Sequence, residues 1–231
     1  LVGKKIQFIR RRAKFILLGL GDDRCLAIHL RMTGKLRLEP GGTPPRAHDR
    51  VALALSDGRA LHFNDTRKFG RLTLTSTDAV LLRQLGPEPL SPAFTPDDLH
   101  RRLTQSRRML KPWLLDQAHV AGLGNIYVDE ALWAAGLHPE RRTDSLTPGE
   151  IRRLHAAVVR VLKRGISLGG TTLGNGLTNF YSVAGRRGRH VDKLEVFRRH
   201  GEACSRCGTI IERRVVGQRG THLCPTCQPL P

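Results

Sequence analysis

The segment CSRCGTIIERRVVGQRGTHLCPTC, residues 204–227, decides how the C-terminal end of the chain folds. Cys204 and Cys207 are separated by two residues, and Cys224 and Cys227 repeat that spacing after a gap of 16 residues. Each pair lets two thiolates reach one ion from a tight turn, and two pairs complete a tetrahedral four-sulfur site. Because four protein ligands leave no open coordination position, a zinc ion here is expected to be structural and not to activate water.

Two disulfide bonds are the alternative interpretation of these cysteines. The basic N-terminal segment lacks the apolar core and cleavage site of a signal peptide, so we expect an intracellular protein whose thiols stay reduced. One structural zinc ion is therefore favoured. Cys25, alone in the segment RCLAIHL, is predicted to be a small buried thiol.

The loop between the cysteine pairs alternates apolar residues on both sides of Gly217 to Gly220. This pattern predicts a β-hairpin fastened by the zinc site, with Arg219 near its tip. An arginine at a hairpin tip can enter a nucleic-acid groove or hold a phosphate. A turn arginine that only faces solvent fits the local sequence equally well.

Cations dominate the charge of the chain. The formal net charge is +19 at pH 7, and the first 20 residues contain six cations and no acid. This balance implies a polyanionic partner, with nucleic acid the first candidate and an anionic membrane surface the second. With 39% hydrophobic and 26% charged residues and no apolar stretch of membrane-spanning length, we expect neither a disordered nor a membrane-spanning protein.

The N-terminal third has the pattern of short β-strands. From Ile6 to about Leu74, apolar residues alternate with a period of two. The segment VALALSDGRALHF, residues 51–63, predicts a hairpin with a tight primed turn at Asp57-Gly58. Several such strands separated by turn residues predict an antiparallel sandwich or barrel.

Candidate functional side chains lie among these strands. In RRAKFILL, residues 11–18, cations that include Lys14 precede a predicted buried strand, which fits either a solvated strand end or a cation that touches a substrate. Met32 and Phe69 are by default core residues. Together with Arg67 they could instead form a wedge that fills the gap left when a base leaves the stack.

After a proline-rich linker, GPEPLSPAF at residues 86–94, the apolar period becomes helical. Thr95 and Thr147 each precede a proline and stand three residues before an acid, which predicts two helix N-termini. Residues 171–190, rich in Gly, Asn, Ser and Arg, predict a mobile loop.

The segment GLGNIYVDEALWAAG predicts a helix that begins at Asn125 as N-cap and stops at Gly136. Amides at such a helix start can bind an anion, although most capping asparagines are structural. Lys111, directly before Pro112-Trp113, is by default a surface charge.

Taken in order, these motifs resemble bacterial formamidopyrimidine-DNA glycosylases over essentially the whole chain. The shared motifs are RRAKFILL, HLRMTGKL, NDTRKFG, LGPEPL, KPWLLD, GLGNIYVDEALWAAGLHP, GGTTL and the four-cysteine finger. The resemblance implies an α+β fold in three parts: a β-sandwich over 1–85 that is N-terminally incomplete, a helix-two-turns-helix domain over 95–182, and a base-covering loop with a zinc-finger hairpin over 183–231.

The resemblance also implies an activity. Such enzymes flip oxidised purines, 8-oxoguanine and formamidopyrimidines among them, out of duplex DNA, excise them, and cleave the abasic site through a Schiff base. Lys14 corresponds to a lysine that serves DNA binding and β-elimination, and Arg219 to a finger arginine linked to phosphate and δ-elimination. The trio that fills the space of the flipped base corresponds to Met32, Arg67 and Phe69. The phosphate contacts correspond to Asn125 and Lys111, and a DNA-contacting loop histidine corresponds to His48.

Two departures from the family pattern stand out. The family begins with a Pro-Glu segment that supplies the nucleophilic amine and the acid, whereas this sequence opens at LVGKKIQF. We therefore expect a longer native chain or a fragment, and no efficient excision by residues 1–231 alone. In the base-covering loop, Gly188-Arg189-His190 stands where the family usually has Gly-Tyr.

Two other functions remain open at this point: a non-catalytic zinc-finger DNA-binding protein of the same fold, and a pyrimidine-directed glycosylase of the sister endonuclease VIII group. The Met32 motif and the Arg-Lys-Phe segment favour the purine-directed enzymes. The expected partner is damaged double-stranded DNA, with no membrane, and the expected protein is a monomer in the bacterial cytoplasm near the nucleoid.

Overall fold

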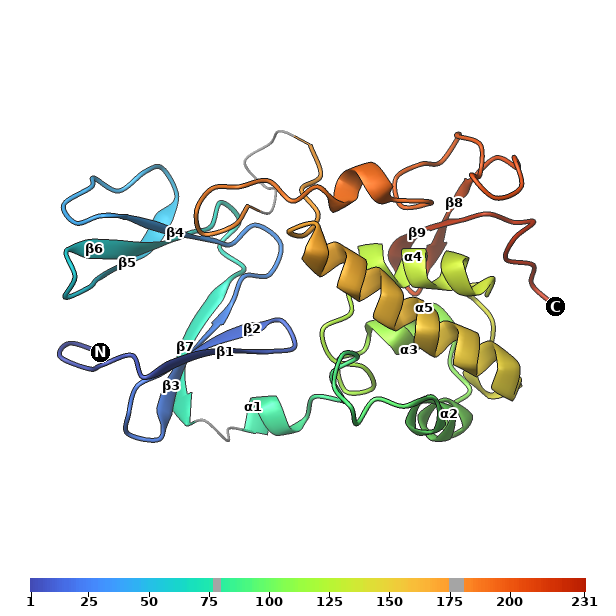
Figure 1. Cartoon of the computed structure of the whole chain (residues 1–231), viewed down its shortest axis with the longest axis horizontal. Helices are drawn as coiled ribbons and strands as arrows, with labels where there is room; N and C mark the ends of the chain where they lie inside the picture. The colour runs from blue at the N-terminus through green and yellow to red at the C-terminus, as the bar shows by residue number, and fades with distance from the viewer. Residues whose placement is uncertain (77–79, 175–180) are drawn as a thin grey trace. The chain divides into compact units, whose positions relative to one another are not determined.

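The computed structural model describes residues 1–76, 80–174 and 181–231, drawn in Figure 1. The chain divides into two compact units. The β unit comprises Leu1–Leu82 and Gly165–Asp192, and the helical unit comprises Arg83–Arg164 and Lys193–Pro231. The described residues of the expected loop at 171–190 all belong to the β unit, and residues 175–180 lie outside the described part of the chain.

The β unit contains two antiparallel sheets. One has the strand order β1-β2-β3-β7 and consists of β1 (Phe8–Arg12), β2 (Phe15–Gly19), β3 (Arg24–His29) and β7 (Arg71–Ser76). The other has the order β4-β6-β5 and consists of β4 (Lys35–Pro40), β5 (Asp49–Ala54) and β6 (Arg59–Asn64).

Apolar residues from both sheets share one core. Leu18, Leu26 and Ile28 of the first sheet form a buried cluster with Leu36 and Phe63 of the second. Burial of each such side chain stabilises the fold by about 1.5–3 kcal/mol. The two sheets therefore face each other, and the predicted antiparallel sandwich is confirmed.

The hairpin predicted over residues 51–63 is present, but its turn differs from the prediction. Leu53 pairs with Leu61, and the Leu55 N–H donates to the Arg59 carbonyl at 2.8 Å, which leaves a loop of three residues, 56–58. Only Gly58 has a positive φ, of 79°, whereas a type I′ turn needs positive φ at both central residues. The Asp57 carboxylate accepts the Arg59 N–H instead, at 3.1 Å, and this local bond stabilises the longer loop.

The helices lie mainly in the helical unit. They are α1 (Val80–Arg83), α2 (Pro96–Thr104), α3 (Leu110–Leu115), α4 (Asn125–Ala135) and α5 (Pro148–Ser167), with the short 3₁₀ helices η1 (Thr143–Ser145) and η2 (His190–Lys193). Apolar side chains of α2 to α5 form one buried cluster around Trp113. In the part of the chain that the structure describes, none of the helices has the length and apolarity that a membrane span requires.

Two of the predicted helix N-termini are confirmed. Thr95 Oγ1 accepts the Asp98 N–H at 3.1 Å. At the other helix, Thr147 Oγ1 accepts the backbone N–H of Glu150, and the Glu150 carboxylate accepts the backbone N–H of Thr147. The third was wrong in detail. Gly124 is the N-cap of α4 and Asn125 its first residue, because the Asn125 side chain bonds a distant carbonyl instead of its own helix end. The predicted stop at Gly136 is confirmed, with φ of 69°.

Candidate nucleic-acid interface and zinc site

In the β unit, Met32, Arg67 and Phe69 form one exposed cluster. Arg67 Nη1 lies 3.5 Å from Met32 Sδ, and the Arg67 guanidinium lies 4.6 Å from the centroid of the Phe69 ring. Met32 is 63% exposed and Phe69 is 48% exposed, so the default interpretation of both as core residues is wrong. Exposed apolar side chains held against an arginine are suited to insertion between bases.

Asp65, which the sequence analysis missed, holds this cluster in place. Its carboxylate is fully buried and accepts hydrogen bonds from the Thr33 hydroxyl and from the backbone N–H of Gly70, the latter at 2.7 Å. Burial by itself would raise the pKa of Asp65, but these hydrogen bonds outweigh it and the pKa is lowered. The carboxylate therefore joins the turn that carries Met32 to the loop that carries Arg67.

Lys14 is exposed in the two-residue turn between β1 and β2, and the predicted strand behind it is confirmed as β2. His29, on β3, packs edge-on against Phe15 with ring centroids 4.8 Å apart. Burial, together with the charges of Arg31 and Lys14, lowers the pKa of His29 to about 4. A neutral His29 therefore adds no further positive charge near Lys14.

His48 lines a cavity of about 360 Å³ in the β unit. Lys35, Arg46 and Asn64 line the same cavity, and the Lys35 ammonium lies 5.2 Å from the centroid of the Tyr181 ring. His48 Nδ1 also lies 3.3 Å from an Arg50 guanidinium nitrogen. The histidine is therefore exposed in cationic surroundings, as a DNA contact requires.

The backbone is strained next to several predicted site residues. Of seven described non-glycine residues with positive φ, five are a predicted site residue or its direct neighbour: Ala13, Arg31, His48, Lys68 and Gln218. Each such conformation costs about 1–3 kcal/mol and tends to occur where a protein holds a ligand. This signal is invisible in the sequence, because none of these five residues is a glycine.

In the helical unit, Lys111 is fully buried, so its interpretation as a surface charge is wrong. Its ammonium lies 2.5 Å from Asp129 Oδ1 and donates to the Gly220 carbonyl at 3.1 Å. Burial lowers the pKa of Lys111, the Asp129 carboxylate opposes that shift, and the charge of Arg219 adds to it. These two bonds use two of the three ammonium N–H groups, and full burial keeps the third away from a phosphate at the surface.

The same carbonyl positions the hairpin strand. Asn125 Nδ2 donates to the Gly220 oxygen at 2.9 Å, and the second oxygen of Asp129 accepts the backbone N–H of His222 at 3.0 Å. Together with Lys111, these contacts fasten the strand that begins at Arg219. Asn125 and Lys111 thus bond the same carbonyl, although 13 residues separate them in the sequence.

The hairpin predicted between the cysteine pairs is confirmed as β8 (Glu212–Val216) and β9 (Arg219–Leu223). Gly217 and Gln218 both have positive φ, of 55° and 62°, as a two-residue primed turn requires. A Cβ at Gly217 would lie 2.5 Å from Pro112 Cγ, so the turn packs closely against α3. Arg219 is exposed beside this turn, as predicted.

The four cysteines of the finger converge. Their sulfur atoms all lie within 4.8 Å of one another, with Cys204 and Cys227 3.9 Å apart and Cys207 and Cys224 3.4 Å apart. Tetrahedral zinc with Zn–S bonds of about 2.3 Å needs sulfur atoms about 3.8 Å apart, so the four thiolates fit one ion. All five cysteines are unbridged, which contradicts the disulfide alternative, and Cys25 is buried as predicted.

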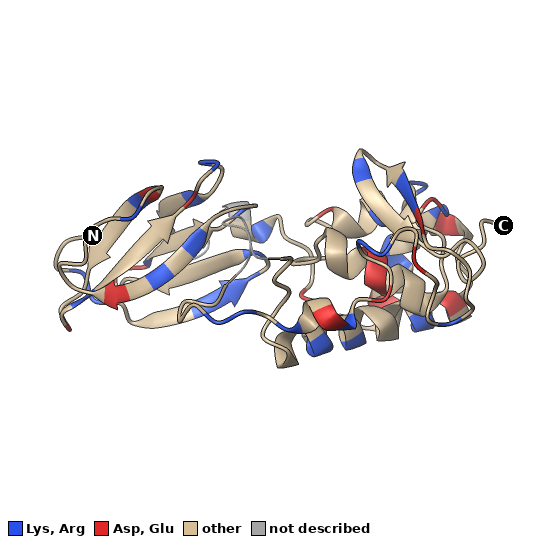
Figure 2. Cartoon of the chain, turned by 90° about the horizontal axis from the view of Figure 1, so that it is seen from above, with Lys and Arg blue, Asp and Glu red and all other residues tan. Residues whose placement is uncertain are grey.

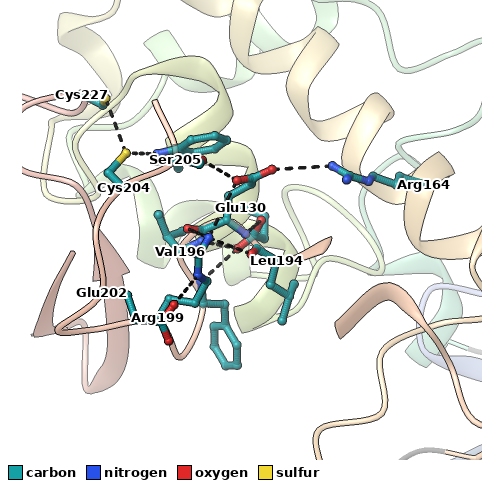
Figure 3. Close-up of polar contacts among 12 residues, drawn as sticks. Glu130, Arg164, Leu194, Val196, Arg199, Glu202, Cys204, Ser205 and Cys227 are labelled. Atoms are coloured by element: carbon teal, nitrogen blue, oxygen red, sulfur yellow. Dashed lines mark hydrogen bonds and ion pairs between the residues drawn. The ribbon is translucent and has the colours of Figure 1, made fainter. Parts of the chain in front are cut away.

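A second acid that the sequence analysis missed, Glu130 of α4, attaches the finger to the helices (Figure 3). Its carboxylate is 4% exposed and accepts the backbone N–H groups of Glu195, Val196 and Phe197 at 2.9–3.0 Å. Burial raises the pKa of Glu130, and these three bonds oppose the shift. Nearby, Trp133 Nε1 lies 3.4 Å from Cys204 Sγ. Adjacent acids inside an otherwise apolar helix were the sequence signal for Asp129 and Glu130.

Three family models match the chain. Residues 1–72 match the formamidopyrimidine-DNA glycosylase N-terminal domain, residues 85–176 match the formamidopyrimidine-DNA glycosylase H2TH domain, and residues 201–230 match the zinc finger found in Fpg and isoleucyl-tRNA synthetase. The matches follow the order of the sandwich, the helices and the zinc-finger hairpin.

Curated relatives and solved structures agree with these matches. The formamidopyrimidine-DNA glycosylase of Herpetosiphon aurantiacus is 46% identical over 227 residues, which cover 97% of this chain and 82% of the relative. A complex of Lactococcus lactis Fpg with DNA containing an abasic site has a TM-score of 0.91 and 42% identity, and the match covers 100% of this chain and 84% of the other. The crystal structure of the Fpg protein of Thermus thermophilus has a TM-score of 0.90 and 44% identity, and the match covers 99% of this chain and 85% of the other.

Proposed function

The chain belongs to the formamidopyrimidine-DNA glycosylase family, and from that premise we propose that it excises oxidised purines from duplex DNA and cleaves the abasic site. The observation that carries this proposal is the exposed cluster of Met32, Arg67 and Phe69. A glycosylase must fill the space that the flipped nucleotide vacates, and two apolar side chains with one cation can do so. The net charge of +19 supplies attraction to the phosphates.

Separate roles follow for the two proposed catalytic cations. Lys14, exposed on a turn that two strands support, serves DNA binding and β-elimination at the damaged nucleotide. Arg219, exposed at the hairpin tip, holds a phosphate and serves δ-elimination. The nucleophilic amine and the acid of the family are assigned to no residue of this sequence. Asn125 is a proposed phosphate contact, and His48 is a proposed DNA contact from its loop. Lys111, expected to be a second phosphate contact, contributes by fastening the hairpin.

The partner we propose is damaged double-stranded DNA, bound by a monomer at the nucleoid. Relatives support the DNA partner, since a mutant of Lactococcus lactis Fpg has been solved with DNA that contains Fapy-dG. The zinc ion is structural. The four cysteines would leave it no coordination position for water, and the bound ion would stabilise the folded hairpin.

Borohydride trapping of the full-length protein on an 8-oxoguanine duplex tests this function. We expect a covalent protein–DNA adduct, because reduction captures the Schiff base. Salt-sensitive duplex binding without any adduct would instead identify the non-catalytic DNA-binding alternative. A clear preference for oxidised pyrimidines over 8-oxoguanine would identify the pyrimidine-directed alternative.

Replacing Lys14 with glutamine is expected to slow strand cleavage at a preformed abasic site by about 10²-fold, the usual contribution of a positioned proton-transfer or charged group. Single-turnover gel assays measure the rate. Arg10→Gln is the matched control, because it removes the same charge from the exposed face of β1. Equal losses in the two variants would reduce Lys14 to a general electrostatic contact.

Arg67→Ala is expected to weaken binding to a duplex with an abasic-site analogue about tenfold, and binding to undamaged duplex much less. The reason is that the wedge is used only where a nucleotide has left the stack. Fluorescence anisotropy with both duplexes measures the ratio of the affinity for the abasic-site duplex to the affinity for the undamaged duplex. Arg59→Ala, which removes an exposed arginine paired with Asp57, should leave that ratio unchanged. Equal losses on both duplexes for Arg67→Ala would make Arg67 an ordinary phosphate contact.

A further inference from the structure

The exposed face of α5 carries a row of cations. Five basic residues lie within an arc of roughly 120° on a helix with 3.6 residues per turn, and no acid shares that arc. The five are Arg152, Arg153, Arg160, Lys163 and Arg164. The one acid of α5, Glu150, lies at the start of the helix, where it bonds Arg141 and caps the helix.

Three of these cations have no internal partner. Among the residues that the structure describes, Arg152, Arg160 and Lys163 make no hydrogen bond or ion pair, and we call these three the α5 stripe. Their neighbours are engaged: Arg153 reaches the Ala135 carbonyl at 3.5 Å, and Arg164 lies 4.0 Å from Glu195. The α5 stripe therefore presents its charge to solvent.

This arrangement does not stabilise the helix itself. Arg160 lies three and four residues before Lys163 and Arg164, and like charges at these spacings destabilise a helix by about 0.2–0.5 kcal/mol per pair. Arg152 lies in the N-terminal half of the helix, where the helix dipole offers a cation no support. The buried apolar face of α5 is what anchors the helix. The α5 stripe is thus better explained by an external polyanion than by folding.

The α5 stripe and the zinc-finger hairpin lie on different sides of the helical unit. Figure 2, seen from above, shows the β8–β9 hairpin projecting from the side opposite α5, and Figure 1 shows α5 in front of the hairpin strands. Arg219 and Asn125 belong to the hairpin side. One straight duplex held by Arg219 would therefore leave the α5 stripe uncovered.

We propose that the α5 stripe binds a second DNA duplex while the hairpin side holds the first. From Arg152 to Lys163 the helix extends about 16 Å. A duplex carries about one phosphate charge per 1.7 Å of its axis, so about nine phosphate charges span this length and each of the three cations can meet one of them. Binding of this kind is independent of base sequence, and it lets the protein pass from one DNA segment to another without a free state. The inference rests on the proposed function only in taking DNA as the ligand of the first side.

Resonance energy transfer between two labelled duplexes tests the proposal. The full-length protein is saturated with a donor-labelled duplex that contains an abasic-site analogue, and an undamaged acceptor-labelled duplex is then titrated. We expect a transfer signal that grows with acceptor concentration. In the triple variant Arg152→Gln/Arg160→Gln/Lys163→Gln that signal should be lost, while affinity for the first duplex stays within twofold. In the unaltered protein the salt slope of acceptor binding should be about three, roughly one unit per cation of the α5 stripe.

A matched triple variant controls for net charge. Arg101→Gln/Arg107→Gln/Arg142→Gln removes three exposed cations from the same unit, each already paired with Asp98 or Asp144. This variant should retain the transfer signal. An equal loss in both triple variants, or no signal from the unaltered protein, overturns the proposal. If the first duplex fails to bind, the proposed function is contradicted and not this proposal. The α5 stripe is then still tested by fluorescence anisotropy, which compares binding of the acceptor duplex alone by the unaltered protein and by the α5 stripe variant.

Discussion

Replacing Asp129 with alanine is expected to lower the free energy of unfolding of the helical unit by about 3–5 kcal/mol. The Lys111 ammonium and the Asp129 carboxylate are both fully buried, and their contact is 2.5 Å long. Removing one partner leaves a buried charge without compensation, which costs far more than the net stability that the pair itself provides. The variant also frees the backbone N–H of His222, which the carboxylate accepts at 3.0 Å.

Urea unfolding followed by tryptophan fluorescence measures this loss selectively. The chain has two tryptophans, Trp113 and Trp133, and both belong to the helical unit. Glu202→Ala is the control, since it removes an acid from the exposed pair with Arg199 and should cost less than about 1 kcal/mol. The double variant Lys111→Met/Asp129→Leu should recover part of the loss, because it removes the unpaired charge but still leaves the Gly220 carbonyl and the His222 N–H without these partners. If Asp129→Ala lowers the free energy of unfolding no more than Glu202→Ala does, the buried Lys111–Asp129 pair does not have the importance argued for it.

Cys204→Ser is expected to release the zinc ion and abolish DNA binding. Three thiolates and a serine hydroxyl make a poor zinc site, and zinc binding to such fingers contributes about 10–16 kcal/mol to their folding. Without the ion, β8 and β9 form only a two-stranded hairpin, which is at best marginally stable alone. Arg219 then loses its fixed position, and the Gly220 carbonyl no longer holds Lys111 and Asn125.

Atomic absorption of the purified variant measures the metal, and anisotropy with a labelled duplex measures the binding. Cys25→Ser provides the control, because that thiol is buried in the β unit and should leave one zinc ion per chain. Unchanged DNA affinity in a zinc-free Cys204→Ser variant would show that the finger is dispensable.

Features that depend on neighbours in the sequence could be predicted. The two cysteine pairs, the caps at Thr95 and Thr147 and the stop at Gly136 each follow from residue types a few positions apart, and the structure contains all of them. The period of two was likewise enough to indicate the sandwich, since alternation determines which face of a strand is buried.

Features that depend on distant partners could not be predicted in this way. Lys111 was misinterpreted because the carbonyl that it bonds lies 109 positions away, at Gly220. The cap expected at Asn125 failed for the same reason, since the Asn125 side chain bonds that carbonyl instead. Glu130 was missed because its backbone partners lie 65 to 67 positions later. The roles proposed for the individual DNA-contacting residues remain predictions.

The two attachments of β9 limit how the finger can vary among related sequences. At one end of the strand, Gly220 is held by side chains of the helices, and at the other end Cys224 belongs to the metal site. One inserted residue between them would turn every following side chain to the opposite face, and two would lengthen the strand by about 7 Å. Thr221, His222 and Leu223, which lie between these two points, are all buried, so large substitutions there are constrained as well. Homologous fingers should therefore agree above all in the length of this strand.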